Sequence, residues 1–345
     1  MRSFQRKGFS AKIELFKPLI LNREHASQMQ ILPEAGSFFD GRFRYAGMPL
    51  FISVSEAASL PNCCFIDVRS RVVHGWDALG AYCRGHVAGA QFLAFDRVFA
   101  REPVFELGRH PWPDRRTVAA HLLGVLGPAG NALQRMIFYD DGGMNFAARA
   151  ALCARWAGFK NAQILDGGLS AWVRCGLPLN DGAPAAADHP AAERVNDFLR
   201  QTIAGAVPQI LGKAAFFNAV NKGDRLVIDG RPRERFAGRT ENLDARPGHV
   251  PGAVNRPATE NLDADGCLKS REALRREWGA VIGGRDPRSI VQMCGSGVAA
   301  CLNAAVLDAA GILPIAEAAL YPGSWSQWAA DSNLPAEIGY RDTVE

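Results

Sequence analysis

The sequence predicts an α/β protein built from two tandem copies of one domain, each a parallel sheet with helices on both faces. The first observation is internal repetition, because four short segments of the first half recur in the same order in the second half. The second is that short, continuously apolar strands alternate with helical segments, which is typical of parallel sheets buried between helices. The third is length, because 345 residues correspond to about two domains of ordinary size.

The repeated segments set the correspondence between the two halves. They are FIDVR at 65–69 and VIDGR at 227–231, GHVAGA at 85–90 and GHVPGA at 248–253, MIFYD at 136–140 and IVQMC at 290–294, and GLSAW at 168–172 and GSWSQW at 323–328. The third pair is a buried strand followed in each half by a small Gly-rich loop and an Ala-rich stretch. In parallel sheets ligands bind at the carboxyl ends of strands, so these two loops are the first places to look for a site.

Helices are predicted where the loops between strands become long and periodic. The predicted helices are 116–126 and 145–158 in the first half, and 211–222, 271–278 and 298–310 in the second.

Composition divides the chain into four parts. Residues 181–193 are rich in Pro, Ala and Gly without hydrophobic periodicity and are predicted to be a linker. The domains are therefore placed at 48–180 and 194–340. Residues 1–47 have no secretory signal pattern, and we expect a poorly ordered N-terminal extension.

Charge and hydropathy argue against several classes of partner. Hydrophobic residues make up 48% and charged residues 21%, so the chain is not of the disordered class. No apolar run approaches the ~18 residues of a membrane helix, so no membrane partner is expected. The net charge of +4 comes from residues 1–47, which hold eight basic and four acidic residues; the rest is neutral, and no nucleic-acid partner is predicted.

The eight cysteines are scattered and include no CxxC pair, so neither a zinc site nor a thioredoxin-type redox motif is predicted. A chain of this length does not need disulfides, and the default expectation is a reducing compartment and a cytoplasmic location. We expect most of these thiols to be buried and inert, and no metal or organic cofactor.

One cysteine stands where chemistry is favoured. Cys294 ends a buried strand, and the sequence CGSGVAA carries it through two glycines into a predicted helix. Such a loop lets backbone N–H groups converge on the sulfur while the positive end of the helix adds its field. Both effects favour the thiolate, the form that attacks, so Cys294 is the predicted nucleophile. The matching loop of the first half has Asp140 at this position, so the first copy is predicted to be inactive in its own loop.

These motifs together resemble the tandem-domain rhodanese superfamily, with an inactive first domain and a catalytic second one. The resemblance is carried by the paired GHxxGA segments, the CGSGVAA loop, LDGGLSAW and the final YPGSW, and it covers about residues 50–338. Within the superfamily a CGSGVTA loop is typical of the 3-mercaptopyruvate sulfurtransferases, whereas thiosulfate sulfurtransferases usually carry Arg and Lys after the cysteine. The loop residues that the resemblance implies around the donor are Gly295, Gly297, Val298 and Ala299, with Ala299 where Thr is usual.

The resemblance also implies arginines that hold the donor carboxylate. An arginine in an RFxG segment maps onto Arg235. The second family arginine follows nine positions later, where this chain has Asp244. Arg239 or Arg246 is the candidate to replace it, and the sequence leaves the choice open. One carboxylate suits a bidentate arginine, whereas compact dianionic thiosulfate would gain from a cation inside the loop.

A Ser-His-Asp relay is implied as well. The loop serine maps onto Ser296, the aspartate onto Asp96 after the first GHxxGA segment, and the histidine onto His110, at a spacing a few residues longer than usual. Sulfur transfer from mercaptopyruvate leaves an enolate that must be protonated, and histidine is suited to that near neutral pH.

The predicted function is sulfur transfer from 3-mercaptopyruvate through a Cys294 persulfide to cyanide, a small thiol or a thioredoxin-like protein. Thiosulfate:cyanide sulfurtransfer is the first alternative, and a persulfide carrier without turnover is the second. Related phosphatases need an arginine at the sixth position after the cysteine, and Ala300 stands there, which argues against that activity.

Overall fold

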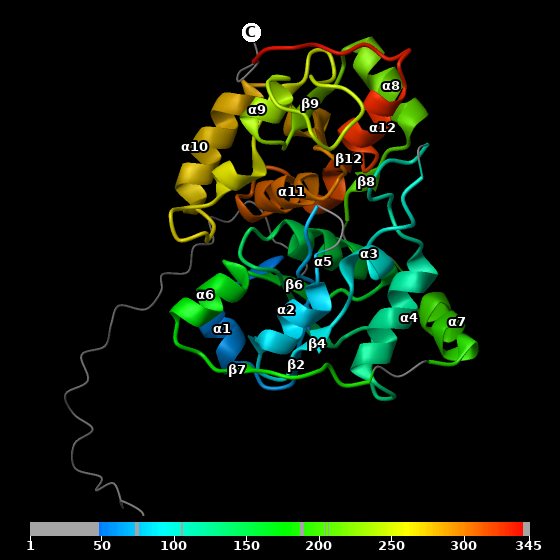
Figure 1. The fold of residues 1–345 in the computed structure, drawn as a ribbon, viewed down its shortest axis with the longest axis vertical. Coiled ribbons are helices and arrows are strands. Elements are labelled where there is room, and N and C mark those ends of the chain that lie inside the picture. Colours follow the sequence, from blue (N-terminus) through cyan, green and yellow to red (C-terminus); the bar gives the residue numbers. More distant parts are fainter. Residues whose placement is uncertain are drawn as a thin grey trace, which may run out of the picture. The chain divides into compact units, whose positions relative to one another are not determined.

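The computed structural model describes residues 48–72, 76–104, 106–186, 190–203, 205 and 207–340, which all lie in one compact unit (Figure 1). The prediction for residues 1–47 lies outside this range. Within it, no helix is long and apolar enough to cross a membrane.

The first half alternates strands and helices as predicted. Its elements are β1 (Phe51–Ile52), α1 (Val54–Ser59), β2 (Cys63–Asp67), α2 (Ala78–Arg84), β3 (His86–Val87), β4 (Gln91–Phe92), α3 (Phe95–Val98), α4 (Arg115–Leu126), β5 (Arg135–Tyr139), α5 (Asn145–Ala157), β6 (Ala162–Leu165), α6 (Gly168–Arg174), β7 (Leu179–Asn180) and α7 (Ala192–Gln201).

The second half repeats this alternation. Its elements are β8 (Gln209–Ile210), α8 (Lys213–Lys222), β9 (Leu226–Asp229), α9 (Arg233–Phe236), β10 (Val254–Asn255), the 3-10 helix η1 (Ala258–Asn261), α10 (Arg271–Ile282), η2 (Pro287–Ser289), β11 (Ile290–Met293), α11 (Ala299–Ala309), η3 (Ile315–Glu317), β12 (Ala319–Leu320) and α12 (Ser324–Ala330). The predicted helices all form, with ends shifted by up to four residues.

Each half contains a five-stranded parallel sheet, which confirms the predicted fold class. The strand order is β1-β6-β5-β2-β4 in the first sheet and β10-β9-β11-β12-β8 in the second. The middle strands correspond: Phe138 of β5 pairs with Ile66 and Ile164, and Gln292 of β11 pairs with Ile228 and Leu320. The strand that precedes each Gly-rich loop is therefore the central strand of its sheet.

Alternate residues of a strand point to opposite faces, and helices cover both faces. In β5, Met136 and Phe138 pack with α4 and α5 in one core cluster, whereas Ile137 and Tyr139 pack with α1 and α6 in another. The strand β11 follows the same rule, because Ile290 faces α11. Burial on both faces explains why the strands read as continuous apolar runs.

The two halves share one core. Helix α5 of the first half packs along α11 of the second, and Figure 1 shows these helices lying against each other between the two sheets. Both helices are rich in alanine, which allows close approach. As a result, the Gly-rich loops that precede α5 and α11 lie near the boundary between the halves.

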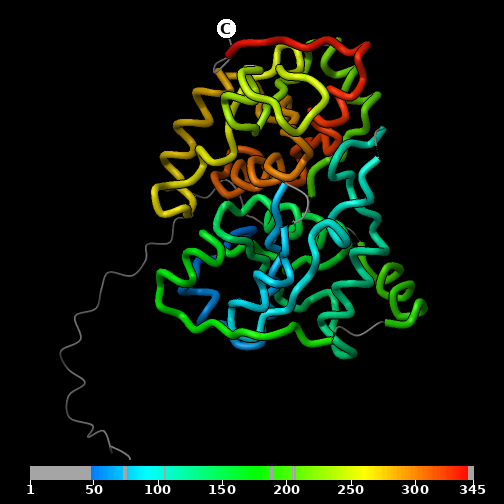
Figure 2. The backbone as a smooth tube through the Cα atoms, viewed as in Figure 1, coloured from blue at the N-terminus to red at the C-terminus, as the bar shows by residue number. Residues whose placement is uncertain are grey.

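A segment of the first half reaches the end of the second half. The chain between α3 and α4 runs beside α12, and Figure 2 shows this cyan segment next to the red C-terminal one. The backbone N–H of Arg109 donates to Ser326 Oγ over 3.1 Å, and the Gln327 amide donates to the Glu106 carbonyl. This contact carries residues 109 and 110 to the second half.

The connection between the halves includes a helix. In α7, Phe198 stacks on Phe159 with ring centroids 4.5 Å apart, and Arg194 donates to the Gly127 carbonyl, so α7 packs on the first half. The domain limits of 48–180 and 194–340, with a linker at 181–193, remain a prediction from composition.

Candidate active site

Cys294 lies at the carboxyl end of the central strand β11, in the loop that leads into α11. Cys294 is 3% exposed. The loop N–H groups of Ser296, Val298 and Ala300 donate no hydrogen bond to any described residue. A cluster of free N–H groups at a helix start is an arrangement that binds anions. These loop N–H groups are therefore available to an anion bound beside Cys294.

The first turn of α12 is hydrogen-bonded to the cysteine loop. The Cys294 N–H donates to Ser324 Oγ over 3.1 Å, and the N–H groups of Trp325 and Ser326 donate to the carbonyl oxygens of Cys294 and Gly295 over 3.0 and 2.9 Å. These bonds occupy the start of α12, where N–H groups lack helical partners. The repeated GSWSQW segment thus positions Cys294, the predicted nucleophile.

Two glycines in this loop are required by close contacts. Gly297 has a φ of +74°, and a Cβ there would come within 2.6 Å of the Pro322 backbone. At Gly295 a Cβ would lie 2.9 Å from Arg109 Nη2 and 3.3 Å from Arg235 Nη1. Two guanidinium groups from different halves therefore lie directly against the residue after Cys294.

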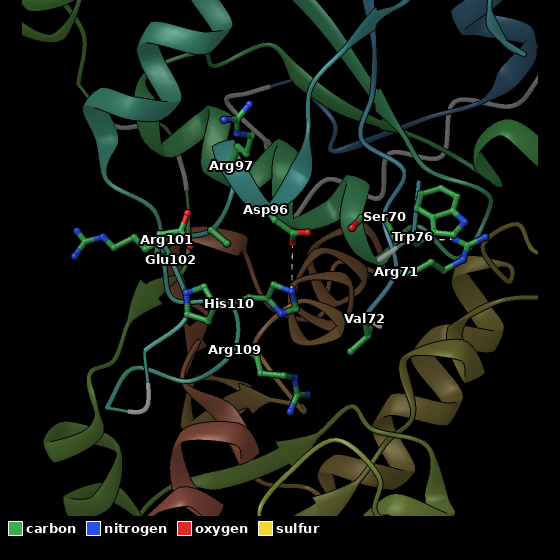
Figure 3. A pocket seen from close by; sticks show the side chains of 12 residues that line it. Ser70, Arg71, Val72, Trp76, Asp96, Arg97, Arg101, Glu102, Arg109 and His110 are labelled. Atoms are coloured by element: carbon green, nitrogen blue, oxygen red, sulfur yellow. Dashed lines mark hydrogen bonds and ion pairs between the residues drawn. The ribbon is translucent and has the colours of Figure 1, made fainter. Parts of the chain in front are cut away.

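Ser296, His110 and Asp96 form a continuous chain of contacts. His110 Nδ1 lies 2.8 Å from Ser296 Oγ, and His110 Nε2 lies 3.5 Å from Asp96 Oδ1. Serine and histidine are buried, whereas the Asp96 side chain is 65% exposed. Figure 3 shows the Asp96 carboxylate pointing toward the His110 ring, with a dashed line joining them. Both residues and Arg109 line a pocket of about 240 Å³. The structure thus brings together the three residues that the sequence placed in different halves.

The matching loop of the first half shows what this backbone can hold. Asp140 takes the position of Cys294, and its carboxylate accepts four N–H groups, from Gly142, Met144, Phe146 and Ala147, over 2.8–3.2 Å. Burial raises the pKa of Asp140, and these four hydrogen bonds oppose the rise. The two loops differ in detail, since φ is positive at Met144 but not at Val298, its counterpart.

Arg235 joins an ion-pair cluster at the edge of the loop. Its Nη2 donates to Glu241 Oε1 over 2.8 Å and to Asp244 Oδ2 over 2.7 Å, and the other oxygen of Asp244 pairs with Arg109 Nη1. Both carboxylates are almost fully buried. Burial and the neighbouring Arg235 lower the pKa of Arg109 to about 10, which leaves its guanidinium cationic at neutral pH.

The other two candidate arginines have partners elsewhere. Arg239 is exposed, pairs with Glu234 over 3.3 Å and stacks over Tyr340. Arg246 donates from Nη2 to carbonyl oxygens near the C-terminus, among them that of Leu334 over 2.6 Å. The structure brings Arg235 to Gly295 and shows no contact of Arg239 or Arg246 with the described loop.

The remaining loop residues lie where the sequence placed them. Val298 is the residue before α11, and Ala299 is the first residue of that helix. Ala299 contributes no hydroxyl.

Sequence reasoning missed two residues of the site. Arg149 is fully buried on α5 and donates to the carbonyl oxygens of Gly297 and His110. Arg109 precedes the relay histidine and lies against Gly295. Its place beside His110 was a signal that the sequence offered, whereas Arg149 lies in an Ala-rich helix that gives no hint of contact with the other half.

The chain is similar to known proteins in sequence. The chain matches the rhodanese-like domain family twice, over residues 53–175 and 214–331. It is 34% identical to 3-mercaptopyruvate sulfurtransferase of Escherichia coli (strain K12) over 262 residues, 74% of this chain and 84% of the relative. It is 26% identical to thiosulfate sulfurtransferase of Azotobacter vinelandii over 298 residues, 85% of this chain and 99% of the relative.

The fold is also similar to that of a solved structure. That of 3-mercaptopyruvate sulfurtransferase from Leishmania major matches with a TM-score of 0.66 at 26% identity, covering 81% of this chain and 73% of that chain. Both halves of the sequence match the same domain family, and both fold as parallel sheets with the loop after the central strand at the boundary between them. The chain therefore belongs to the rhodanese family.

Proposed function

We propose that this protein transfers the sulfur of 3-mercaptopyruvate through a persulfide on Cys294 to a thiol or to cyanide. The observation that carries the proposal is the chain of contacts from Asp96 through His110 to Ser296, two residues after Cys294. Breaking a carbon–sulfur bond leaves a carbanion that needs a proton, whereas thiosulfate leaves sulfite, which does not. A proton relay beside the cysteine therefore favours the carbon-containing donor.

In the first step the Cys294 thiolate attacks the sulfur of the donor. A sulfur–sulfur bond forms, the carbon–sulfur bond breaks, and its electron pair leaves as the enolate of pyruvate. The donor enters with a proton on sulfur and pyruvate leaves with one more proton on carbon. The step is thus balanced by moving a single proton from sulfur to carbon, with no net uptake.

We assign the movement of that proton to Ser296 and His110. A hydrogen bond from His110 Nε2–H to Asp96 would leave Nδ1 as the acceptor for the Ser296 hydroxyl. The Ser296 hydroxyl then takes the proton from the donor's sulfur and passes it to the carbon of the enolate. His110 accepts the serine proton while this transfer takes place. Asp96 acts on the ring orientation and not on the donor.

The loop holds the intermediate. After pyruvate leaves, Cys294 carries a persulfide anion, which the free N–H groups of Ser296, Val298 and Ala300 stabilise. In the first half, four N–H groups of the matching loop donate in a similar way to the side chain of Asp140. An acceptor thiolate or cyanide then attacks the outer sulfur and frees Cys294. A small thiol or a thioredoxin-like protein fits this step.

Initial rates with 3-mercaptopyruvate and with thiosulfate test the proposal, with cyanide as acceptor and Cys294→Ser as the blank. We expect pyruvate release to exceed thiosulfate turnover. Ser296→Ala and His110→Asn should each lower kcat with mercaptopyruvate by roughly 10²-fold, the usual weight of a positioned proton relay. The same variants should change thiosulfate turnover far less.

Other results would replace the proposal. Faster turnover of thiosulfate than of 3-mercaptopyruvate, whatever the effect of His110→Asn, would make this a thiosulfate sulfurtransferase. Loading of one sulfur on Cys294 in mass spectrometry, without release of pyruvate or sulfite above the blank, would make it a persulfide carrier.

A further inference from the structure

Arg109 comes from the first half but ends in the cysteine loop of the second. Its backbone N–H is held by Ser326 Oγ over 3.1 Å, and its side chain is 17% exposed. Its Nη2 would lie 2.9 Å from a Cβ on Gly295, next to the nucleophile. In Figure 3 the side chain extends away from Asp96, on the opposite side of His110. The guanidinium is thus built into the site by contacts between the halves.

Asp244 links this guanidinium to that of Arg235. One carboxylate oxygen pairs with Arg109 Nη1 and the other lies 2.7 Å from Arg235 Nη2. The Asp244 side chain is 2% exposed, so the bridge is shielded from water. The position where the family pattern has its second arginine therefore carries a carboxylate, and that carboxylate positions an arginine from the other half.

The two guanidiniums keep donors that are not used. Arg109 Nε and Nη2 and Arg235 Nε are buried and have no hydrogen-bond partner among the described residues. Unpaired buried donors are costly, and those on a guanidinium are matched best by a carboxylate. The free Nη2 of Arg109 lies against Gly295, the residue that follows Cys294.

We propose that Arg109 is the second carboxylate-binding arginine of this site, acting with Arg235 on a donor that carries a carboxylate beside its reacting carbon. The proposal rests on the proposed function for the identity of that donor, 3-mercaptopyruvate. Arg109 and His110 also line a pocket of about 240 Å³ on the side of the first half. Asp244 is a positioning residue, since it contacts the arginines and not the donor.

Alkylation of Cys294 tests the proposal without assuming the natural donor. Iodoacetate carries a carboxylate beside its reactive carbon, whereas iodoacetamide is its neutral analogue. We expect Arg109→Gln to lower the rate of Cys294 alkylation by iodoacetate about tenfold, as for a lost charge-assisted hydrogen bond, and to leave the iodoacetamide rate within about twofold. Arg84→Gln removes an exposed positive charge from the first half and serves as the matched control, with no change in the ratio.

The kinetic arm uses 3-mercaptopyruvate with the same variants. Arg109→Gln should raise KM about tenfold or more with a smaller change in kcat. The KM of Arg109→Lys should lie between those of Arg109→Gln and the unmodified protein, because lysine keeps the positive charge but cannot form two parallel hydrogen bonds to a carboxylate. An iodoacetate to iodoacetamide ratio that is unchanged in Arg109→Gln overturns the proposal. If that variant does not fold, the ratio in Arg109→Lys decides in the same way.

The two proposals fail separately. A chain that releases no pyruvate, yet loses its preference for iodoacetate in Arg109→Gln, keeps the arginine assignment and loses the mercaptopyruvate function. A chain that releases pyruvate with the same KM in Arg109→Gln and with an unchanged alkylation ratio keeps the function and loses the arginine assignment.

Discussion

Arg149 of the first half donates a hydrogen bond from Nη1 to the carbonyl oxygen of Gly297 in the second half, over 3.2 Å. The same guanidinium donates from Nη2 to the carbonyl oxygens of His110 and Pro111, each over 3.1 Å, and lies 4.3 Å from the Trp112 ring centroid. One fully buried side chain therefore links the segment that carries His110 to the cysteine loop.

Replacing Arg149 by Met should lower kcat roughly tenfold or more, because small displacements of reacting groups have large effects on rate. Arg155→Met is the matched control, since Arg155 is also buried on α5 but donates to the carbonyl oxygens of Ala162 and Met48. Both variants should lose stability by leaving carbonyl groups unpaired. Initial rates per folded molecule, with folding followed by circular dichroism, separate the two. An equal loss of kcat in both would show that Arg149 has no particular role at the site.

Asp140 should be a stability residue. Asp140→Ala leaves four N–H groups without an acceptor, two of them buried and two partly buried, and we expect the free energy of unfolding to fall by about 3 kcal/mol in urea denaturation. Asp141→Asn, which removes a half-exposed charge next to it, should change the free energy of unfolding by less than about 1 kcal/mol. Similar values for both would mean that the loop N–H groups find water instead.

The cysteines should differ sharply in reactivity. Burial raises the pKa of Cys301 to about 12 and that of Cys153 to about 11, so both should resist iodoacetamide in the folded protein at about pH 8. Cys294 should react, and Cys175 should react as an ordinary exposed thiol. Peptide mapping by mass spectrometry checks this order, and urea should make all of them reactive. Early alkylation of Cys301 would contradict the expectation.

Acid should destabilise the second half through His249. This ring stacks on Phe236, and burial lowers its pKa below the ordinary 6.5. The unfolded chain then binds the proton more readily than the folded one, so the stability present above pH 6.5 is lost as the pH falls through the folded pKa. His249→Phe should flatten the dependence of the unfolding midpoint on pH below about pH 6.5. An unchanged slope would assign the acid sensitivity to other groups.

The fold, and the position of Cys294 in a Gly-rich loop after the central strand, followed from the sequence because both depend on local patterns. Continuous apolar strands such as 290–293 are buried on both faces, and a Gly-rich turn after such a strand places its first residue at the sheet edge. Repetition then required the same arrangement at Asp140. These features need only a few neighbouring residues, so they are readable without coordinates.

The neighbours of Cys294 could be predicted in part. Ser296 is in the loop itself, and resemblance supplied His110 and Asp96, whose contacts the structure shows. Arg239 and Arg246 were the candidates for the second carboxylate-binding arginine because, in the family pattern, that arginine lies in the second half. The structure shows instead an arginine of the first half at Gly295.

The sequence by itself determined the two α/β halves, the cysteine loop and the aspartate that replaces it, since each is set by the residues of one strand, one turn and one helix. Only the tertiary structure decided that Arg109 and Arg149 belong to the same site, because their placement depends on how α5 packs on α11 and how the segment before α4 docks on α12. Contacts between segments about 150 to 200 residues apart have no periodicity that a sequence displays.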